Sequence, residues 1–193
     1  DLFMALIIKL LRVGGRAGVV LPDGFLFGEG TKTTLKRTLM EECNLHTIVR
    51  LPNGVFNPYT GIKTNLLFFT KGTPTKHIWF YEHPYPSGVT NYNKSRPMQF
   101  EEFATERDWW GDEADGFKAR VETEQAWRVS AEDVEAFGFN LDRKNPHTPD
   151  RESHDPDELL AQYAAQQSDI QGLRDRLKAI LASALAGGDG AVA

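Results

Sequence analysis

The chain has 193 residues, of which 40% are hydrophobic and 25% are charged, and its formal net charge is −5. These proportions are typical of a soluble globular domain, and no apolar run has the length that a membrane-spanning helix needs. The acidic balance is not that of a stand-alone DNA-binding domain, which carries an excess of lysine and arginine, but it leaves open DNA contact through a local basic patch within a larger assembly. The one cysteine, Cys43, excludes an internal disulfide and favours a buried thiol in a reducing, cytoplasmic compartment.

The first part of the chain predicts an alternation of helix and strand. Apolar residues recur at helical spacing from Leu2 to Leu11, and Gly14-Gly15 ends that helix. Residues 16–21 (RAGVVL) are rich in β-branched side chains, as expected for an interior strand of a parallel sheet, and residues 31–43 predict a second helix. Because the chain enters an apolar helix at once, without an initiator methionine, we expect it to be a piece of a longer protein.

Three further strands are expected over residues 45–51, 65–72 and 77–83. Strands that alternate with helices predict a right-handed parallel βαβ unit, and the close spacing of the last strands predicts an antiparallel finish. Residues 1–83 therefore read as a partial α/β core. We expect residues 84–149 to wrap around this core, because prolines, aromatic and acidic residues alternate there with little periodicity except for a short helix capped by Ser130.

Residues 150–193 predict a linker, a long helix and a flexible glycine-rich tail. Asp155-Pro156 is a strong helix start. The following residues alternate by four and three, which is a heptad pattern of just over three repeats. We favour an arm that pairs with another helix over a helix that packs back on its own domain, with this seam: Leu159, Tyr163, Gln166, Ile170, Leu173, Leu177, Ile180 and Ala184.

The sequence predicts no complete catalytic, cofactor or metal site. A nucleotide or S-adenosylmethionine pocket needs a glycine turn directly after a strand. Gly14-Gly15 precedes a strand instead, and residues 24–30 (GFLFGEG) carry bulky side chains between their glycines that would crowd a ligand. The five histidines have neither an i, i+4 partner on a helix nor a cysteine partner, so we expect surface or core histidines.

The segment GVFNPYTGIKTNLLFF, residues 54–69, contains an irregular loop between two predicted strands. Asn57-Pro58-Tyr59 lacks one proline of the Asn-Pro-Pro-Tyr/Phe signature of amino-methylating enzymes. Residue types alone favour a packed turn whose aromatic side chains cover the sheet edge. The alternative is an aromatic platform for a nucleobase, with Lys63 close to the phosphates.

Four segments resemble the C-terminal part of the DNA-methylating (M) subunit of type I restriction-modification systems, which are N6-adenine methyltransferases. The segments are GGRAGVVLPDGFLFGEG, LHTIVRLPNGVFNPYTGIKTNLLFFTKG, IWFYEHPYP and WRVSAEDVEAFGFNLDRKNPH. The resemblance implies an α/β fold: the C-terminal half of a Rossmann-like methyltransferase sheet, mostly parallel with one antiparallel strand. It also implies that the glycine turn and the Asn-Pro-Pro-Phe/Tyr motif lie N-terminal to this region, so Asn57-Pro58-Tyr59 is not the catalytic tetrapeptide.

The resemblance also favours the second interpretation of the loop, the aromatic platform for a nucleobase, over the packed turn. By position, Phe56 matches the aromatic residue that stacks on the flipped adenine, Lys63 matches a lysine that follows it, and Tyr59 is expected to shape the same wall. The S-adenosylmethionine of the full-length subunit would bind outside this chain, so we expect the chain alone to hold no cofactor and to be catalytically inactive.

The resemblance further implies partners. The arm (Leu159, Tyr163, Ile170, Leu173, Leu177 and Ile180) would dock on the specificity subunit, a restriction subunit would complete the complex, and DNA would be bound through the complex. A homo-oligomer through the bare sheet edge or the arm is a further expectation. Two alternatives remain open: a non-enzymatic assembly or regulatory module derived from such a subunit, and a relative that methylates small molecules.

Overall fold

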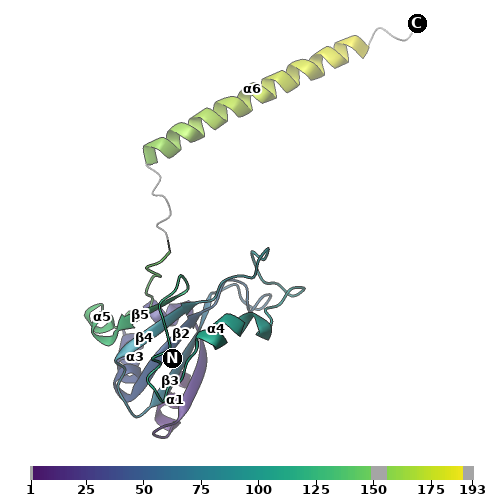
Figure 1. Cartoon of the computed structure of the whole chain (residues 1–193). Helices are drawn as coiled ribbons and strands as arrows, with labels where there is room; N and C mark the ends of the chain where they lie inside the picture. The colour runs from purple at the N-terminus through teal and green to yellow at the C-terminus, as the bar shows by residue number, and fades with distance from the viewer. Residues whose placement is uncertain (1, 149–155, 189–193) are drawn as a thin grey trace. The chain divides into compact units, whose positions relative to one another are not determined.

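The computed structural model describes residues 2–148 and 156–188, and in the last helix it describes the side chains of residues 160, 163–181 and 183 (Figure 1). Contacts divide the chain into two units, residues 1–148 and residues 149–193. The first unit is an α/β domain with the following elements: α1 (Leu2–Leu10), β1 (Arg16–Pro22), α2 (Asp23–Phe27), α3 (Thr31–Glu42), β2 (Cys43–Arg50), β3 (Thr64–Lys71), β4 (His77–Glu82), η1 (Phe100–Phe103), α4 (Ala104–Trp109), β5 (Ala126–Ser130) and α5 (Ala131–Ala136).

The five strands form one sheet in the order β1-β3-β2-β4-β5. Only β2 and β4 pair in parallel, and the other three pairings are antiparallel. The expectation of a mostly parallel sheet is therefore wrong for this chain. The reason lies in the connection after β2, which turns the chain back so that β3 inserts, antiparallel, between β1 and β2. β1 and β2 consequently run in the same direction without being neighbours, and β3 and β4 are not paired at all.

β1 lies at an edge of the sheet, whereas its sequence predicted an interior strand. It pairs with β3 on one side, and its residues alternate between exposed and half-buried positions. Val20 on this strand is 50% exposed. Helix α1 turns Met4 and Ile8 into the core and packs Ile7 against it, while four of its apolar side chains remain exposed: Leu2, Phe3, Leu6 and Leu10.

Alternating side chains build an apolar layer on each face of the sheet, as the period of two in a strand requires. Ile48, Leu67 and Phe80 point to the face that α1, α3 and α5 cover. Their neighbours Val49 and Tyr81 point to the opposite face, which is covered by η1, α4 and the aromatic side chains of Phe103, Trp109 and Trp110. The main core is thus on the α1/α3/α5 face, and a smaller one lies under the α4 segment.

A β-bulge interrupts the pairing of β2 with β3. Leu45 pairs with Phe69 and Thr47 pairs with Phe68, so His46 is an extra residue on β2. Because a bulge lets two residues oppose one, Leu45 and Ile48 both enter the main core while His46 turns to the other face.

Residues 84–148 belong to the same compact unit as residues 2–83. Part of the segment packs on one face of the sheet, and another part adds β5, which pairs antiparallel with β4 and forms the second edge. Trp127 of β5 stacks on Phe80 at 5.4 Å between ring centroids. Ser130 caps α5 through a hydrogen bond from the Asp133 amide, as the sequence predicted.

The second unit consists of α6 (Pro156–Gly188), a helix of 33 residues. The helix itself agrees with the heptad pattern. The predicted seam residues Leu159 and Ala184 lie outside the described side chains, and the coiled-coil pairing stays a prediction. The described apolar residues of this helix are all exposed: Leu160, Tyr163, Ile170, Leu173, Leu177, Ile180 and Leu181.

Candidate functional site

The loop of residues 51–63 leaves the sheet at the carboxyl end of β2. This is the end at which ligands bind in open α/β sheets, because the chain leaves the strands there and frees side chains for contact. The loop is closed at its base by a hydrogen bond from the Leu51 amide to the Thr64 carbonyl, at 3.0 Å. Beside it, the His83 amide donates to the Arg50 carbonyl at 2.9 Å, which joins the ends of β2 and β4.

The three predicted site residues lie in this loop, and the structure leaves each of them accessible. Phe56 is 39% exposed and Tyr59 is 93% exposed. Lys63, the last residue of the loop, is also exposed. None of these side chains lines either of the two cavities described below.

The loop is held by residues of the wrapping segment. The Asn57 side chain donates to the Tyr92 carbonyl at 2.9 Å, and the Tyr85 hydroxyl donates to the Asn53 carbonyl at 2.9 Å. Gly54 adopts a φ of 82°, and a Cβ there would lie 2.2 Å from Oδ1 of Asn91. Only glycine fits this close approach. Asn57 therefore has a structural use here, which agrees with its not belonging to a catalytic tetrapeptide.

The segment that supports the loop is itself anchored by buried polar pairs. Tyr92 is 1% exposed, and its hydroxyl donates to Glu102; burial and this carboxylate raise the pKa of Tyr92. His83 at the end of β4 pairs with Glu106 of α4, and both side chains are almost fully buried. Buried polar groups of this kind are costly unless partnered, so the pairs fix where the wrapping segment lies.

The glycine-containing segment after β1 is held by a buried lysine. Phe25 and Leu26 turn into the core, and of the three bulky side chains between the glycines only Phe27 is exposed. The segment presents carbonyl oxygens rather than amides: Nζ of Lys36 donates to the carbonyls of Leu26 and Gly28 at 2.7 and 2.9 Å. Lys36 is 1% exposed, and burial lowers its pKa. These two carbonyls are therefore occupied by a side chain of the same domain.

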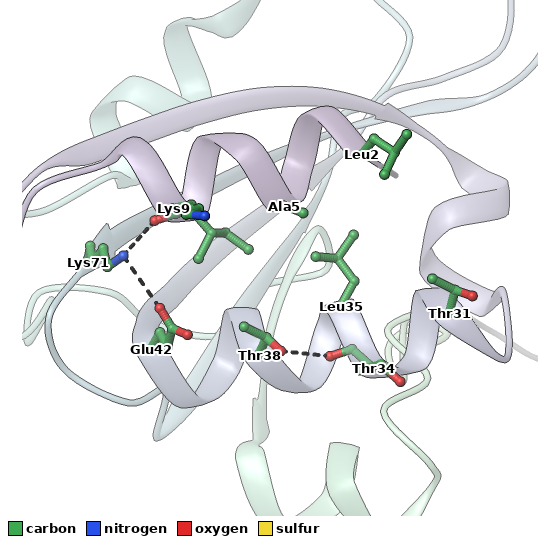
Figure 2. Close-up of a pocket in the computed structure, with 10 residues that line it drawn as sticks. Leu2, Ala5, Lys9, Thr31, Thr34, Leu35, Thr38, Glu42 and Lys71 are labelled. Atoms are coloured by element: carbon green, nitrogen blue, oxygen red, sulfur yellow. Dashed lines mark hydrogen bonds and ion pairs between the residues drawn. The ribbon is translucent and has the colours of Figure 1, made fainter.

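A cavity of about 420 Å³ lies between α1 and α3, on the main-core face of the sheet (Figure 2). Leu2, Ile8 and Leu35 make its lining mostly apolar. Lys71 closes one end, where its Nζ donates to the Ile8 carbonyl at 2.6 Å and pairs with Glu42 at 3.4 Å. The cavity adjoins the exposed side of α1, and its charged groups, Lys71 and Glu42, are paired with each other at one end.

A second cavity, of about 360 Å³, lies on the opposite face over the bulge of β2. His46 lines it together with Arg16, Asp112 and Glu113. His46 is 7% exposed, and burial, with the nearby charges of Arg120 and Arg16, lowers its pKa to about 4. The imidazole is therefore neutral near pH 7.

Arg120 holds this region together. Its guanidinium lies over the Phe117 and Trp109 rings, at 3.7 and 4.5 Å from the ring centroids, and donates to Thr47 Oγ1 at 2.8 Å. Burial lowers the pKa of Arg120 to about 10. The sequence contains no motif that predicts this cluster, because Thr47 is far from Trp109, Phe117 and Arg120 along the chain.

Among the described residues, no group of three or more histidine, cysteine, aspartate or glutamate side chains could hold a metal ion. Cys43 is fully buried, as predicted, and burial raises the pKa of its thiol. His46 and His83 are core histidines, His77 is exposed, and His154 lies outside the described residues. Among the described helices, none is long and apolar enough to span a membrane.

Comparison with known proteins places this site in a family. Residues 2–155 match the family described as N-6 DNA Methylase. The chain belongs to the N-6 DNA methylase family. The methylase subunit of the type I restriction enzyme EcoEI from Escherichia coli is 66% identical to it over 191 residues, which cover 99% of this chain and 39% of that subunit. The chain thus spans about two fifths of the length of this relative.

Solved structures of type I systems share the fold of this N-6 DNA methylase chain. One comes from work on the complex assembly and conformational transition of a type I restriction-modification system; it has a TM-score of 0.72 and 37% identity, covering 94% of this chain and 39% of the other. A modification subunit of a putative type I restriction enzyme from Vibrio vulnificus YJ016 has a TM-score of 0.67 and 43% identity, covering 76% and 32%.

Proposed function

We propose that this chain is part of the methylating subunit of a type I restriction-modification system, a cytoplasmic enzyme that transfers a methyl group from S-adenosylmethionine to N6 of adenine in DNA. The chain supplies one wall of the pocket for the flipped adenine and a helical arm for assembly. The observation that carries the proposal is the tightly held 51–63 loop at the carboxyl end of β2, on which Phe56 is partly exposed.

The residue types of the loop suit an extruded base. Flipping the target adenine costs a few kcal/mol, and stacking a base on an aromatic side chain recovers about 1–3 kcal/mol. Phe56 keeps enough of its ring buried to be held in place, and enough exposed to stack. Tyr59 extends the aromatic surface, and the exposed Lys63 can pair with a phosphate next to the flipped nucleotide.

The free edge of β1 supports the proposal that another part of the subunit completes the sheet. Along Arg16–Pro22 the backbone pairs on one side only, and α1 exposes a row of apolar side chains next to it. An unpaired strand beside an apolar helix face is a template for further strands and helices. We assign the cofactor turn and the Asn-Pro-Pro-Phe/Tyr motif to that missing part, so the 193-residue chain by itself is inactive.

The arm supports assembly with other subunits. The exposed side chains Tyr163, Ile170, Leu173, Leu177 and Ile180 follow one helical stripe, and such a stripe binds a complementary helical surface. We propose that this surface belongs to the specificity subunit, that the restriction subunit joins the same complex, and that DNA is held through the complex. Pairing of two copies of this chain, through β1 or α6, is the competing use of the same surfaces.

The decisive experiment replaces Phe56 in a complete subunit assembled with its specificity subunit. Phe56→Ala should slow single-turnover methylation of unmethylated DNA by about tenfold or more, because removing the ring forfeits the stacking energy. Phe100→Ala is the matched control, since Phe100 is 68% exposed but lies outside the loop. Equal rates for the two variants and the unaltered enzyme would reject the assignment of Phe56.

The alternative is a non-enzymatic module that keeps the arm and has lost the chemistry. It is distinguished by the reading frame upstream of Asp1. An in-frame glycine turn and an Asn-Pro-Pro-Phe/Tyr sequence there would support the enzyme, and an immediate stop codon would support the module. Strongly salt-dependent binding of the assembled protein to duplex DNA would count against a methyltransferase of small molecules.

A further inference from the structure

Residues 139–147, which we name the strap, run across the carboxyl ends of three strands. The Leu141 amide donates to the Leu26 carbonyl of α2, which follows β1, at 3.0 Å. Asp142 pairs with Arg50, the last residue of β2, at 2.7 Å. Asn145 donates to Glu82, the last residue of β4, at 3.2 Å. The strap therefore contacts the end of the sheet from which the 51–63 loop emerges.

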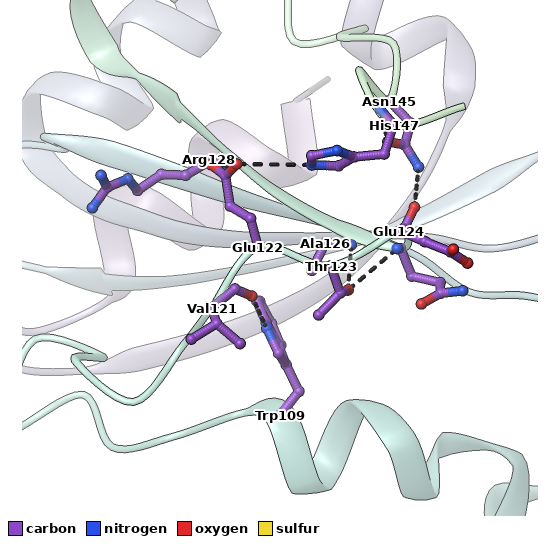
Figure 3. Close-up of polar contacts among 10 residues, drawn as sticks. Trp109, Val121, Glu122, Thr123, Glu124, Ala126, Arg128, Asn145 and His147 are labelled. Carbon is purple, nitrogen blue, oxygen red and sulfur yellow. Dashed lines mark hydrogen bonds and ion pairs between the residues drawn. The ribbon is translucent and has the colours of Figure 1, made fainter. Parts of the chain in front are cut away.

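The far end of the strap contacts the segment that precedes β5 (Figure 3). The Asn145 side chain also donates to the Glu124 carbonyl at 2.7 Å, and Nε2 of His147 lies 3.7 Å from a carboxylate oxygen of Glu122. The near end is fixed by Leu141, which is fully buried. Between these two anchors, Arg50 is the residue through which the strap touches the base of the loop.

Arg50 joins three segments at this point. Its Nη2 lies 2.7 Å from Asp142 and 3.7 Å from Asp23, and its Nη1 donates to the Arg143 carbonyl at 3.0 Å. The Arg50 side chain is 17% exposed. A guanidinium shared between two carboxylates and a carbonyl, out of most of the solvent, forms stronger and more directional bonds than a surface ion pair.

The same cluster binds both ends of the 51–63 loop. Arg50 precedes the loop, and Asn65, its register partner on β3, follows it. Asp23 contacts both of these residues: its carboxylate accepts a hydrogen bond from the Asn65 side chain at 2.8 Å and lies 3.7 Å from Arg50. The Asp23 amide also donates to the Lys63 carbonyl at 2.9 Å. The width of the loop base and the direction of its first and last residues therefore depend on the Arg50–Asp23–Asp142 cluster.

We propose that Arg50 is a positioning residue, which holds the 51–63 loop in one arrangement by tying its base to Asp23 and to the strap. Its benefit to methylation rests on the proposed function of Phe56, whereas its effect on the loop does not. Preorganised loops bind a flipped base without having to be ordered at that moment, so loss of Arg50 lowers the turnover rate more than it weakens DNA binding.

The test is amide hydrogen exchange in the 193-residue chain. Arg50→Gln should speed the exchange of the hydrogen-bonded loop amides, those of Asn57, Tyr59 and Thr60, by about tenfold, the factor that loss of one charge-assisted hydrogen bond corresponds to. The amides of Ile48 and Phe80 should be unchanged. Arg50→Lys should restore only part of the protection, because an ammonium cannot span both carboxylates. Arg128→Gln is the matched control, since Arg128 is an exposed arginine on β5.

Asp142→Asn removes one partner of Arg50 but keeps Arg50 itself. If Arg50→Gln disturbs the whole sheet, hydrogen exchange in Asp142→Asn tests the positioning role instead. Faster exchange confined to the loop supports the proposal. Unchanged exchange in the loop, or an increase spread equally over β2, β4 and the loop, overturns it. A double variant no worse than Arg50→Gln would show that the two residues act together.

The assembled enzyme separates this inference from the proposed function. If both hold, Arg50→Gln lowers kcat for DNA methylation about tenfold with little change in KM for DNA, and Phe56→Ala lowers it as well. Faster loop exchange in Arg50→Gln, combined with normal methylation by Phe56→Ala, would keep the positioning role and reject the base-stacking role. Normal exchange of the loop amides in Arg50→Gln would reject the positioning role of Arg50, whatever the methylation rate of Phe56→Ala.

Discussion

Acidification should destabilise this protein through His46. In the folded chain burial, with the charges of Arg120 and Arg16, lowers the pKa of His46 from 6.5 to about 4. A histidine whose pKa is lowered on folding takes up its proton more readily in the unfolded chain. The contribution of the neutral His46 to the free energy of unfolding is therefore fully present above about pH 6.5 and is lost as the pH falls toward about 4.

The magnitude follows from the two pKa values. The whole shift corresponds to about 3 kcal/mol, at 1.36 kcal/mol per pH unit. Between about pH 7.5 and about pH 5, where the unfolded chain becomes protonated at this site and the folded chain remains neutral, His46 alone should remove about 2 kcal/mol. A loss of this size is a sizeable part of the stability of a typical domain.

Urea denaturation of the 193-residue chain at these two pH values measures the loss. His46→Phe preserves a ring against Phe117, which lies 4.8 Å from the His46 ring, but takes up no proton. The variant should therefore lose about 2 kcal/mol less than the unaltered chain on acidification. His77→Phe replaces an exposed histidine and should leave the pH dependence unchanged. Equal losses in His46→Phe and the unaltered chain would refute the reasoning.

Four further substitutions test the packing, the loop, the helix cap and the arm. Leu39→Ala empties a fully buried position of α3 and should lower the free energy of unfolding by about 2–5 kcal/mol in denaturant titrations. Gly54→Ala should cost at least about 1–3 kcal/mol, and more if Asn91 cannot move, because φ is positive and the new Cβ meets Asn91; hydrogen exchange of the loop would locate the damage. Ser130→Ala should cost about 1 kcal/mol, measured in the same titrations, since the cap of α5 is lost. Leu173→Asp on α6 should leave the stability of residues 2–148 unchanged within about 0.5 kcal/mol, yet weaken capture of the specificity subunit in a pull-down.

The 51–63 loop shows which parts of the candidate site could be predicted from residue types and which could not. Its glycines and prolines predicted an irregular loop between two strands, and a resemblance to type I methylating subunits indicated Phe56 as a site residue. The supports of the loop were not readable, because Tyr85 and Tyr92 are separated from it by two strands. Arg50 and Asp142 likewise lie far apart in sequence and meet only when the strap crosses the strand ends.

The sequence by itself determined α1, α3, the first four strands, the Ser130 cap and the helical form of α6, because each depends on a periodicity or a turn signal within about a dozen residues. Only the tertiary structure decided which strands are neighbours, that β1 is an edge, that β5 completes the sheet and that His46 sits in a bulge. Strand pairing is a contact between distant segments, and its register is chosen by which faces the whole domain can bury. A strand's own residues do not carry that information.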